Sequence, residues 1–193
     1  SSKSNRITSG RRAGPDERYP MSNWSPGPGV FGRPQVVFLR FAPWAIFQNN
    51  HPHDLMWPVE MLYAKGIAHA AGWNPIVVDL HVDERNRDQL IQHLITLSPD
   101  LLLIDTMTPT MAYAREIASG VLNRLPELKI WGIGQHATEQ CEDLLYPGSA
   151  FSGVLLGEYP GIIADLLACR GERAVESSAC LGPDGSIIRT GKK

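Results

Sequence analysis

The feature that most constrains the fold of this 193-residue chain is a fivefold alternation of short apolar runs with helical segments. The runs are rich in β-branched and large aliphatic residues, as expected of strands that are buried on both faces. They are QVVFLR (35–40), PIVVDL (75–80), DLLLID (100–105), LKIWGIG (128–134) and FSGVLLG (151–157).

A helical segment follows each run. The first is predicted between Pro58 and Gly72, because proline is favoured at the start of a helix and glycine just after its end. A second helix is predicted near 87–97, and the apolar spacing predicts a third that ends before Pro126. A fourth is predicted to start near Thr138, and a fifth to span about 160–169. Five successive β-α units predict an α/β fold, namely a flavodoxin-like, doubly wound (Rossmann-like) five-stranded parallel sheet.

The two ends of the chain differ from this pattern. Residues 1–33 are rich in Ser, Gly, Pro and Arg and have no hydrophobic period, so they are predicted to form a flexible tail. Residues 34–172 form the predicted Rossmann-like domain. In residues 173–193, two strand-like runs flank GPDG, which predicts a β-hairpin.

The charge distribution argues against nucleic-acid and membrane partners. Residues 34–193 carry twelve Lys/Arg against eighteen Asp/Glu, whereas residues 1–33 carry six against two. No apolar run approaches the roughly 20 residues of a membrane span, and no signal peptide opens the chain. A cytoplasmic protein is expected.

Ligands of open α/β sheets bind beyond the carboxyl ends of the strands, where the strand order reverses. With the flavodoxin-like order 2-1-3-4-5 assumed, the loops that matter most are 41–57, which contains Trp44, His51 and His53, and 105–112. The second loop, DTMTPTM, places small hydroxyls beside soft methionines. In the following GIGQHAT, the glycines allow a ligand to approach the backbone, and the helix start offers N–H groups to a phosphate.

Each of these residues also has an ordinary structural interpretation. Thr106, Thr108 and Thr110 are equally able to cap backbone groups at a strand end. Met107 is a candidate core filler, and His136 a residue that caps or orients its loop.

The stretch LLLIDTMTPTMAYAREIASGVLNRLPELKIWGIGQHAT, followed by GVLLGEYP and SSACLGPDGSIIRTG, resembles the cobalamin-binding domain of cobalamin-dependent radical S-adenosylmethionine enzymes. This family includes methyltransferases and the anaerobic cyclase of bacteriochlorophyll synthesis. The resemblance covers about residues 35–190. It departs from the family at Ile133 and Gln135, where GGPHAT is usual, and at Tyr159 and Pro160, where GEGE is usual.

The resemblance implies that the chain binds cobalamin and that Thr106 and Thr108 lie against the nucleotide tail of the cofactor. The residues implied to bind the cofactor are Thr106, Met107, Thr108, Gly132, Gly134, Gln135, His136, Gly157, Glu158, Trp44, His51 and His53. The D-x-H-x-x-G motif that supplies a lower axial histidine is absent. His51 and His53 are therefore candidate cobalt ligands in the right loop but at a different spacing, and ordinary loop histidines are the alternative.

A radical S-adenosylmethionine barrel normally follows the hairpin, and the chain stops before one. Its three cysteines, Cys141, Cys169 and Cys180, lack the spacing of an iron–sulfur motif. The chain is thus expected to be the non-catalytic, cofactor-binding part of a methyltransferase, with S-adenosylmethionine and the cluster in a companion domain in cis or in trans. A nucleotide- or flavin-binding Rossmann-like domain and a signalling receiver-like domain are the alternatives.

Overall fold

The structure is a computed structural model that describes residues 11–12, 32–42, 57–168 and 175–191. Five strands run parallel in the order β3-β2-β4-β5-β6. Their bounds are β2 Gln35–Arg40, β3 Asn74–Asp79, β4 Leu101–Asp105, β5 Lys129–Ile133 and β6 Gly153–Leu155. This is the flavodoxin-like order 2-1-3-4-5, so the predicted fold class is confirmed.

The sheet is larger than the five strands predicted. The hairpin of β7 (Ser178–Leu181) and β8 (Ile187–Arg189) joins it, because β7 pairs antiparallel with β6. Two residues of the N-terminal segment, β1 (Arg11–Arg12), pair parallel with β8, which gives eight strands. The rest of segment 1–31 lies outside the described residues, and a flexible tail there remains a prediction.

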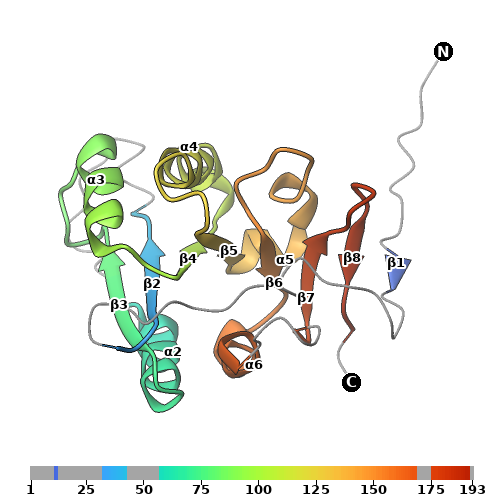
Figure 1. The fold of residues 1–193 in the computed structure, drawn as a ribbon, viewed down its shortest axis with the longest axis horizontal. Coiled ribbons are helices and arrows are strands. Elements are labelled where there is room, and N and C mark those ends of the chain that lie inside the picture. Colours follow the sequence, from blue (N-terminus) through green and yellow to red (C-terminus); the bar gives the residue numbers. More distant parts are fainter. Residues whose placement is uncertain (1–10, 13–31, 43–56, 169–174, 192–193) are drawn as a thin grey trace.

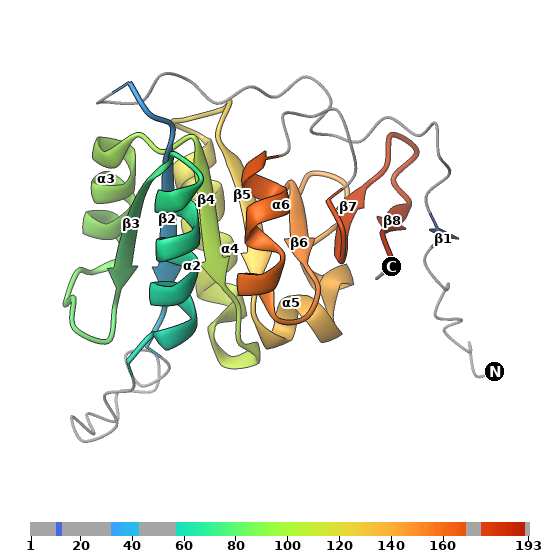
Figure 2. The same cartoon turned by 90° about the horizontal axis from the view of Figure 1, so that it is seen from below.

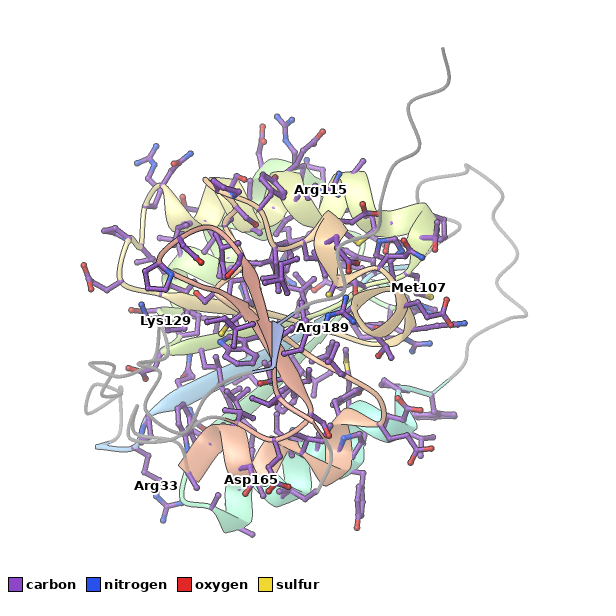
Figure 3. The ribbon with its side chains drawn as sticks, turned by 90° about the vertical axis from the view of Figure 1, so that its right-hand side faces the viewer. Arg33, Met107, Arg115, Lys129, Asp165 and Arg189 are labelled. Atoms are coloured by element: carbon purple, nitrogen blue, oxygen red, sulfur yellow. The ribbon has the colours of Figure 1, made fainter. Side chains whose placement is uncertain are left out.

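Helices cover both faces of the sheet (Figure 1). One face carries α2 (Val59–Ala70) and α6 (Ile163–Ala168), which contact each other. The other carries α3 (Arg87–Leu97) and α4 (Met111–Leu122), and the short α5 (Gln135–Glu139) shares their core. In Figure 3, Arg115 on α4 and Asp165 on α6 accordingly lie on opposite sides of the sheet.

Two apolar cores result, one on each face. The larger packs α3, α4 and α5 against side chains such as Val37 and Leu102, while the other packs α2 and α6 against neighbours such as Phe38 and Leu103. Alternate residues of β2 and β4 point to opposite faces. Residues 36–39 and 101–104 are therefore buried and apolar, which explains the uninterrupted runs in the sequence.

Local sequence explains where the helices begin. The capping box of Asn86 and Gln89 starts α3, and Pro58 precedes the first residue of α2. Among the described residues, no helix is long and apolar enough to cross a membrane.

Candidate functional site

The candidate site lies at the carboxyl-end edge of the sheet, where β2 separates β3 from β4 (Figure 2). The segments after β4, β5 and β6 meet at this edge, as shown by contacts among residues 105–108, 134–138 and 157. The loop after β2 begins here too. Its residues 43–56, which contain Trp44, His51 and His53, lie outside the described residues, so their roles remain predictions.

Thr106 is buried at this edge and links β4 to the segment after β5 by hydrogen bonds. Its side chain is fully buried, and its hydroxyl donates to the carbonyl of Ile133 at 2.9 Å and accepts from the amide of Ala137 at 3.1 Å. Thr110 is also buried, and its hydroxyl bonds the backbone of Met107. The capping interpretation therefore holds for both threonines. The hydroxyl of Thr106 is used within the fold and does not face a ligand, contrary to the expectation for it.

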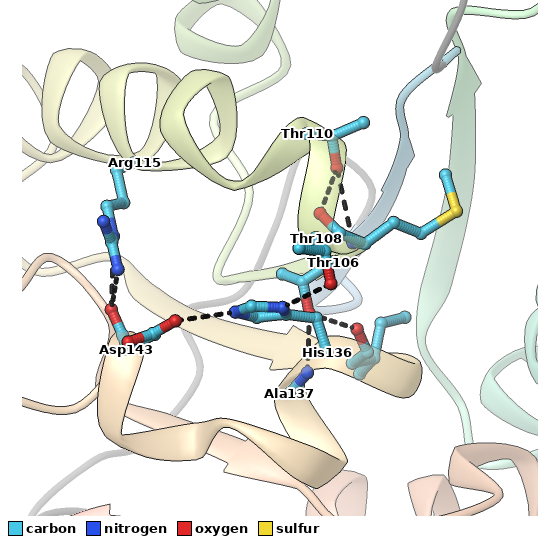
Figure 4. Close-up of polar contacts among 9 residues, drawn as sticks. Thr106, Thr108, Thr110, Arg115, His136, Ala137 and Asp143 are labelled. Carbon is cyan, nitrogen blue, oxygen red and sulfur yellow. Dashed lines mark hydrogen bonds and ion pairs between the residues drawn. The ribbon is translucent and has the colours of Figure 1, made fainter.

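Thr108 behaves differently, because it is exposed. Its hydroxyl lies 3.0 Å from Nδ1 of His136, a ring that is only 5% exposed (Figure 4). Nε2 of the same ring lies 3.2 Å from a carboxylate oxygen of Asp143, off the line of a straight hydrogen bond. Arg115 in turn donates to the backbone carbonyl of Asp143 at 2.5 and 3.1 Å. The turn after β4, helix α5 and the 3-10 turn Cys141–Asp143 are linked in this way.

The two glycines after β5 serve packing and turning. A Cβ on the buried Gly132 would meet the side chains of Leu144 and Val154 at 2.9 and 3.2 Å, so this glycine admits the fold's own side chains. Gly134 has φ +94° and ψ −171°, a conformation open mainly to glycine, and a Cβ there would lie 2.3 Å from Oδ1 of Asp105. The expected approach of a ligand to Gly132 is thus replaced by helix-to-sheet packing.

Three amides in the first turn of α5 have acceptors. The amides of His136, Ala137 and Thr138 donate to the Thr106 carbonyl, the Thr106 hydroxyl and the Gly134 carbonyl, respectively. The predicted donation to a phosphate does not extend to these three amides, and for the rest of the helix start it stays a prediction. The neighbouring Gln135 is exposed and donates to Glu139.

The end of β6 is tied to the same turn. Thr138 donates its hydroxyl to the Gly134 carbonyl and accepts from the Gly157 amide, both at 2.9 Å. Gly157 has φ +93°, is exposed, and has open space where a Cβ would lie. Glu158 beside it is also exposed. The backbone at Gly157 is the stretch of this edge that a ligand can approach closely.

A slot of about 270 Å³ opens at this edge between the start of α2, the ends of β2 and β4, and the turn after β6. Its lining residues are Arg40, Trp57, Pro58, Val59, Glu60, Met61, Asp105 and Tyr159. Trp57 and Val59 are exposed at 81% and 67%, whereas Met61 and Tyr159 are buried. The slot thus combines an apolar rim with a floor that carries charged groups.

The carboxyl of Asp105 has a strongly raised pKa. Burial raises the pKa of its carboxyl from 3.8 to about 6; nearby Arg40 opposes that rise, and Glu60 and Asp79 add to it. Arg40 itself lies 3.3 Å from Asp79, and both side chains are almost buried. Burial likewise raises the pKa of the Tyr159 hydroxyl, which therefore stays protonated.

Sequence reasoning missed Arg40, Asp105 and Tyr159 as site residues. A signal was present, since Arg40 and Asp105 are the charged last residues of otherwise apolar strands. Strands of this kind end at the ligand-binding edge of a parallel sheet.

The sequence of the chain matches the B12 binding domain family over residues 51–165, which is more than half of its 193 residues. The chain belongs to the B12-binding domain family. It is a cobalamin-binding domain, as the resemblance implied. A search of curated proteins found no match.

Solved structures support the fold of this B12-binding domain. It is similar to the cobalamin-dependent S-adenosylmethionine radical enzyme OxsB with aqua-cobalamin and S-adenosylmethionine bound (TM-score 0.70, 14% identity) and with aqua-cobalamin alone (0.68, 15%). It is also similar to apo OxsB (0.62, 13%). Each alignment covers 83% of this chain and 22% of OxsB, so the chain spans about a fifth of that protein's length.

The residues of the slot suit the nucleotide tail of cobalamin. A flat aromatic base needs apolar walls and a polar group for its ring nitrogen, and the slot offers Trp57, Val59 and Asp105. Its volume is near the lower end for small-molecule pockets, which is enough for part of a corrinoid and too little for the ring.

A larger cavity of about 850 Å³ lies on the other face of the sheet, between the β3–α3 loop and α4. Phe41 and Tyr113, which meet edge to face at 5.3 Å, contribute to its lining together with Asp83, Glu84 and Glu116. With Arg85 counted, the lining still carries a net negative charge, which disfavours a phosphate.

Proposed function

We propose that this B12-binding domain holds a corrinoid for methyl transfer in a cobalamin-dependent radical S-adenosylmethionine enzyme. The observation that carries the proposal is the slot between α2, β2, β4 and the turn after β6, at the point where the strand order reverses. The likeness to OxsB supports the radical S-adenosylmethionine context. The bound corrinoid would supply the cobalt centre that carries the methyl group.

The slot residues would bind and orient the nucleotide tail. Trp57 and Val59 form the apolar rim on which a flat base can stack. Because the carboxyl of Asp105 keeps its proton up to about pH 6, it can donate a hydrogen bond to an unliganded ring nitrogen in that range and accept one above it. Arg40 adds a positive charge beside the slot for a phosphate.

The corrin ring would lie across the exposed edge formed by Thr108, the turn at Gly134 and the backbone at Gly157. Thr108 and Gly157 are exposed, and a Cβ at Gly157 would meet open space. His51 and His53 remain the candidate lower axial ligands. Replacing each by alanine and recording the visible spectrum of the bound corrinoid tests this, since loss of a nitrogen ligand shifts the cobalt spectrum.

Catalysis would take place in a companion domain, in cis or in trans, which would hold S-adenosylmethionine and the iron–sulfur cluster. OxsB, of which the chain covers 22%, binds both cobalamin and S-adenosylmethionine and supports this division. A nucleotide-binding glycine loop is not favoured, because the amides of His136, Ala137 and Thr138 donate within the fold. A phosphate-accepting receiver is not favoured either, because β2 ends in Arg40 in place of an acidic residue.

A titration with hydroxocobalamin tests the proposal, with the slot obstructed in one variant. Val59→Trp adds bulk at the slot rim and is expected to weaken binding by at least about tenfold, whereas Leu62→Trp is the matched control. Leu62 is also exposed on α2 but does not line the slot. Equal binding by the two variants would place the nucleotide tail elsewhere, and no binding by the folded wild-type chain would refute the function.

A further inference from the structure

Thr108, His136 and Asp143 form a chain of polar contacts across three separate segments of the site (Figure 4). Thr108 belongs to the turn after β4, His136 to α5, and Asp143 to the 3-10 turn Cys141–Asp143. The ring of His136 is buried between the other two. This arrangement fixes the position of Thr108 and also the direction in which its hydroxyl donates, because only one nitrogen of a neutral imidazole carries a proton.

The position of Asp143 decides which ring nitrogen carries the proton. In the neutral imidazole one nitrogen donates and the other accepts. The Asp143 carboxylate oxygen lies 3.2 Å from Nε2, off the line of a straight hydrogen bond, and its negative charge favours a proton over a lone pair on that nitrogen. Nδ1 is then the acceptor, and the hydroxyl of Thr108, at 3.0 Å, must donate to it.

The hydroxyl hydrogen of Thr108 is thereby used, and only its oxygen lone pairs remain for a ligand. Thr106 and Thr110, its neighbours in the turn, are fully buried and bonded to backbone. Thr108, by contrast, is exposed at the binding edge. A hydroxyl in this state attracts N–H groups and repels the oxygens of phosphates and carboxylates.

We propose that Thr108, oriented by His136 and Asp143, is an acceptor that selects a peripheral carboxamide of the corrinoid ring. This inference rests on the proposed function and specifies the ligand group that meets the edge at this position. Thr108 contacts the ligand, while His136 and Asp143 are positioning residues. The amide N–H donates to the Thr108 oxygen, while the Thr108 hydroxyl continues to donate to Nδ1 of His136.

Asp143→Asn tests the direction of hydrogen-bond donation among Thr108, His136 and residue 143, and it hardly changes the volume of the side chain. An asparagine can donate to Nε2, which favours the proton on Nδ1; Nδ1 then donates to Thr108, and the Thr108 hydrogen turns towards the ligand. Asp143 is about half exposed, so the substitution is compatible with folding. The variant is expected to lose the preference for a carboxamide.

The ligand-free arm of the test is nitrogen-15 NMR of the His136 imidazole, which distinguishes the two neutral tautomers. Wild-type His136 is expected to show the Nε2–H tautomer, and Asp143→Asn to shift the population towards Nδ1–H. A wild-type Nδ1–H tautomer, or the same tautomer in both proteins, would overturn the proposal whether or not cobalamin binds.

The binding arm compares hydroxocobalamin with derivatives in which one peripheral carboxamide at a time is hydrolysed to a carboxylate. For one derivative, wild type is expected to prefer the amide by about tenfold, and Thr108→Val to lose this preference while keeping its fold. Thr108→Ser, which keeps the hydroxyl, should restore it. Equal discrimination by wild type and Thr108→Val would overturn the inference alone, whereas no binding of hydroxocobalamin by folded wild type would overturn the proposed function as well.

Discussion

Asp105 shows how the packing around a strand end makes an ordinary carboxylate unusual. The residue continues the apolar run of β4, and the elements packed around it remove it from water. Burial is the first cause of its raised pKa, and the nearby charge of Arg40 only partly compensates it. The ionised form therefore destabilises the free domain, and perturbed groups of this kind are common at functional sites.

This raised pKa predicts that Asp105→Asn increases the free energy of unfolding by an amount that depends on pH. Because the folded-state pKa of about 6 lies above the ordinary 3.8, this group lowers stability progressively as pH rises from about 4 through 6. The advantage of the asparagine variant should be on the order of 2–3 kcal/mol larger at pH 8 than at pH 4. Urea unfolding of both proteins across this pH range measures it, and a difference independent of pH would contradict the buried carboxyl.

Gly134 and Gly157 have nearly the same positive φ but differ in the space around a Cβ, so alanine substitutions at the two positions can be compared. Gly134→Ala must accommodate both a strained backbone and a Cβ at 2.3 Å from Asp105, so a loss on the order of 2–4 kcal/mol is expected. Gly157→Ala has a similar φ and open space, so about 1 kcal/mol is expected. Thermal unfolding of the two variants compares these costs, and equal costs would show that the contact with Asp105 is unimportant.

Among the elements, the strands and long helices follow from local sequence alone. The predicted runs contain β2 to β6 to within a few residues, since buried parallel strands and amphipathic helices carry strong periodic signals. The start of α5 was predicted near Thr138 and lies at Gln135, because a distant side chain, Thr106, accepts the Ala137 amide. A contact across 31 residues leaves no trace in the local pattern.

The candidate site was less predictable than the elements. The resemblance assigned contacts with the ligand to Thr106 and Gly132. In the structure the Thr106 hydroxyl caps backbone groups and Gly132 packs against side chains, and the assignment of the site to these loops stays a prediction. Whether a hydroxyl faces inwards or outwards depends on tertiary contacts that the sequence of one turn does not contain. The slot depends on the packing of α2 beside the ends of β2 and β4, which is also a tertiary property.

The junction between β4, β5 and α5 should depend on the Thr106 hydroxyl. Thr106→Val preserves shape but leaves the buried Ala137 amide without its acceptor, at a cost of about 1–3 kcal/mol. Thr106→Ser keeps the acceptor. Hydrogen exchange at the Ala137 amide should accelerate in the valine variant and stay close to wild type in the serine variant. Unchanged protection in both would show that the amide does not need this hydroxyl.

At the scale of the whole molecule, one sheet carries both the domain and the hairpin. Because β7 pairs with β6 and β8 extends it, the C-terminal segment is part of the same sheet. Arg189 of β8 donates to the buried thiol of Cys141 at 3.0 Å and pairs with Glu142, which ties the hairpin to the turn that carries Asp143. The hairpin therefore contacts the turn that positions Asp143.

We propose that this domain binds cobalamin through its nucleotide tail, in the slot between α2 and the ends of β2 and β4. The most direct measurement is a paired titration of the chain with hydroxocobalamin and with cobinamide, which has the corrin ring but no nucleotide. Binding through the nucleotide tail predicts saturable binding of hydroxocobalamin. It also predicts that cobinamide binds at least about a hundredfold more weakly, a difference in binding free energy of about 2.7 kcal/mol. Equal affinity for the two corrinoids, or no binding of either by the folded chain, would contradict it.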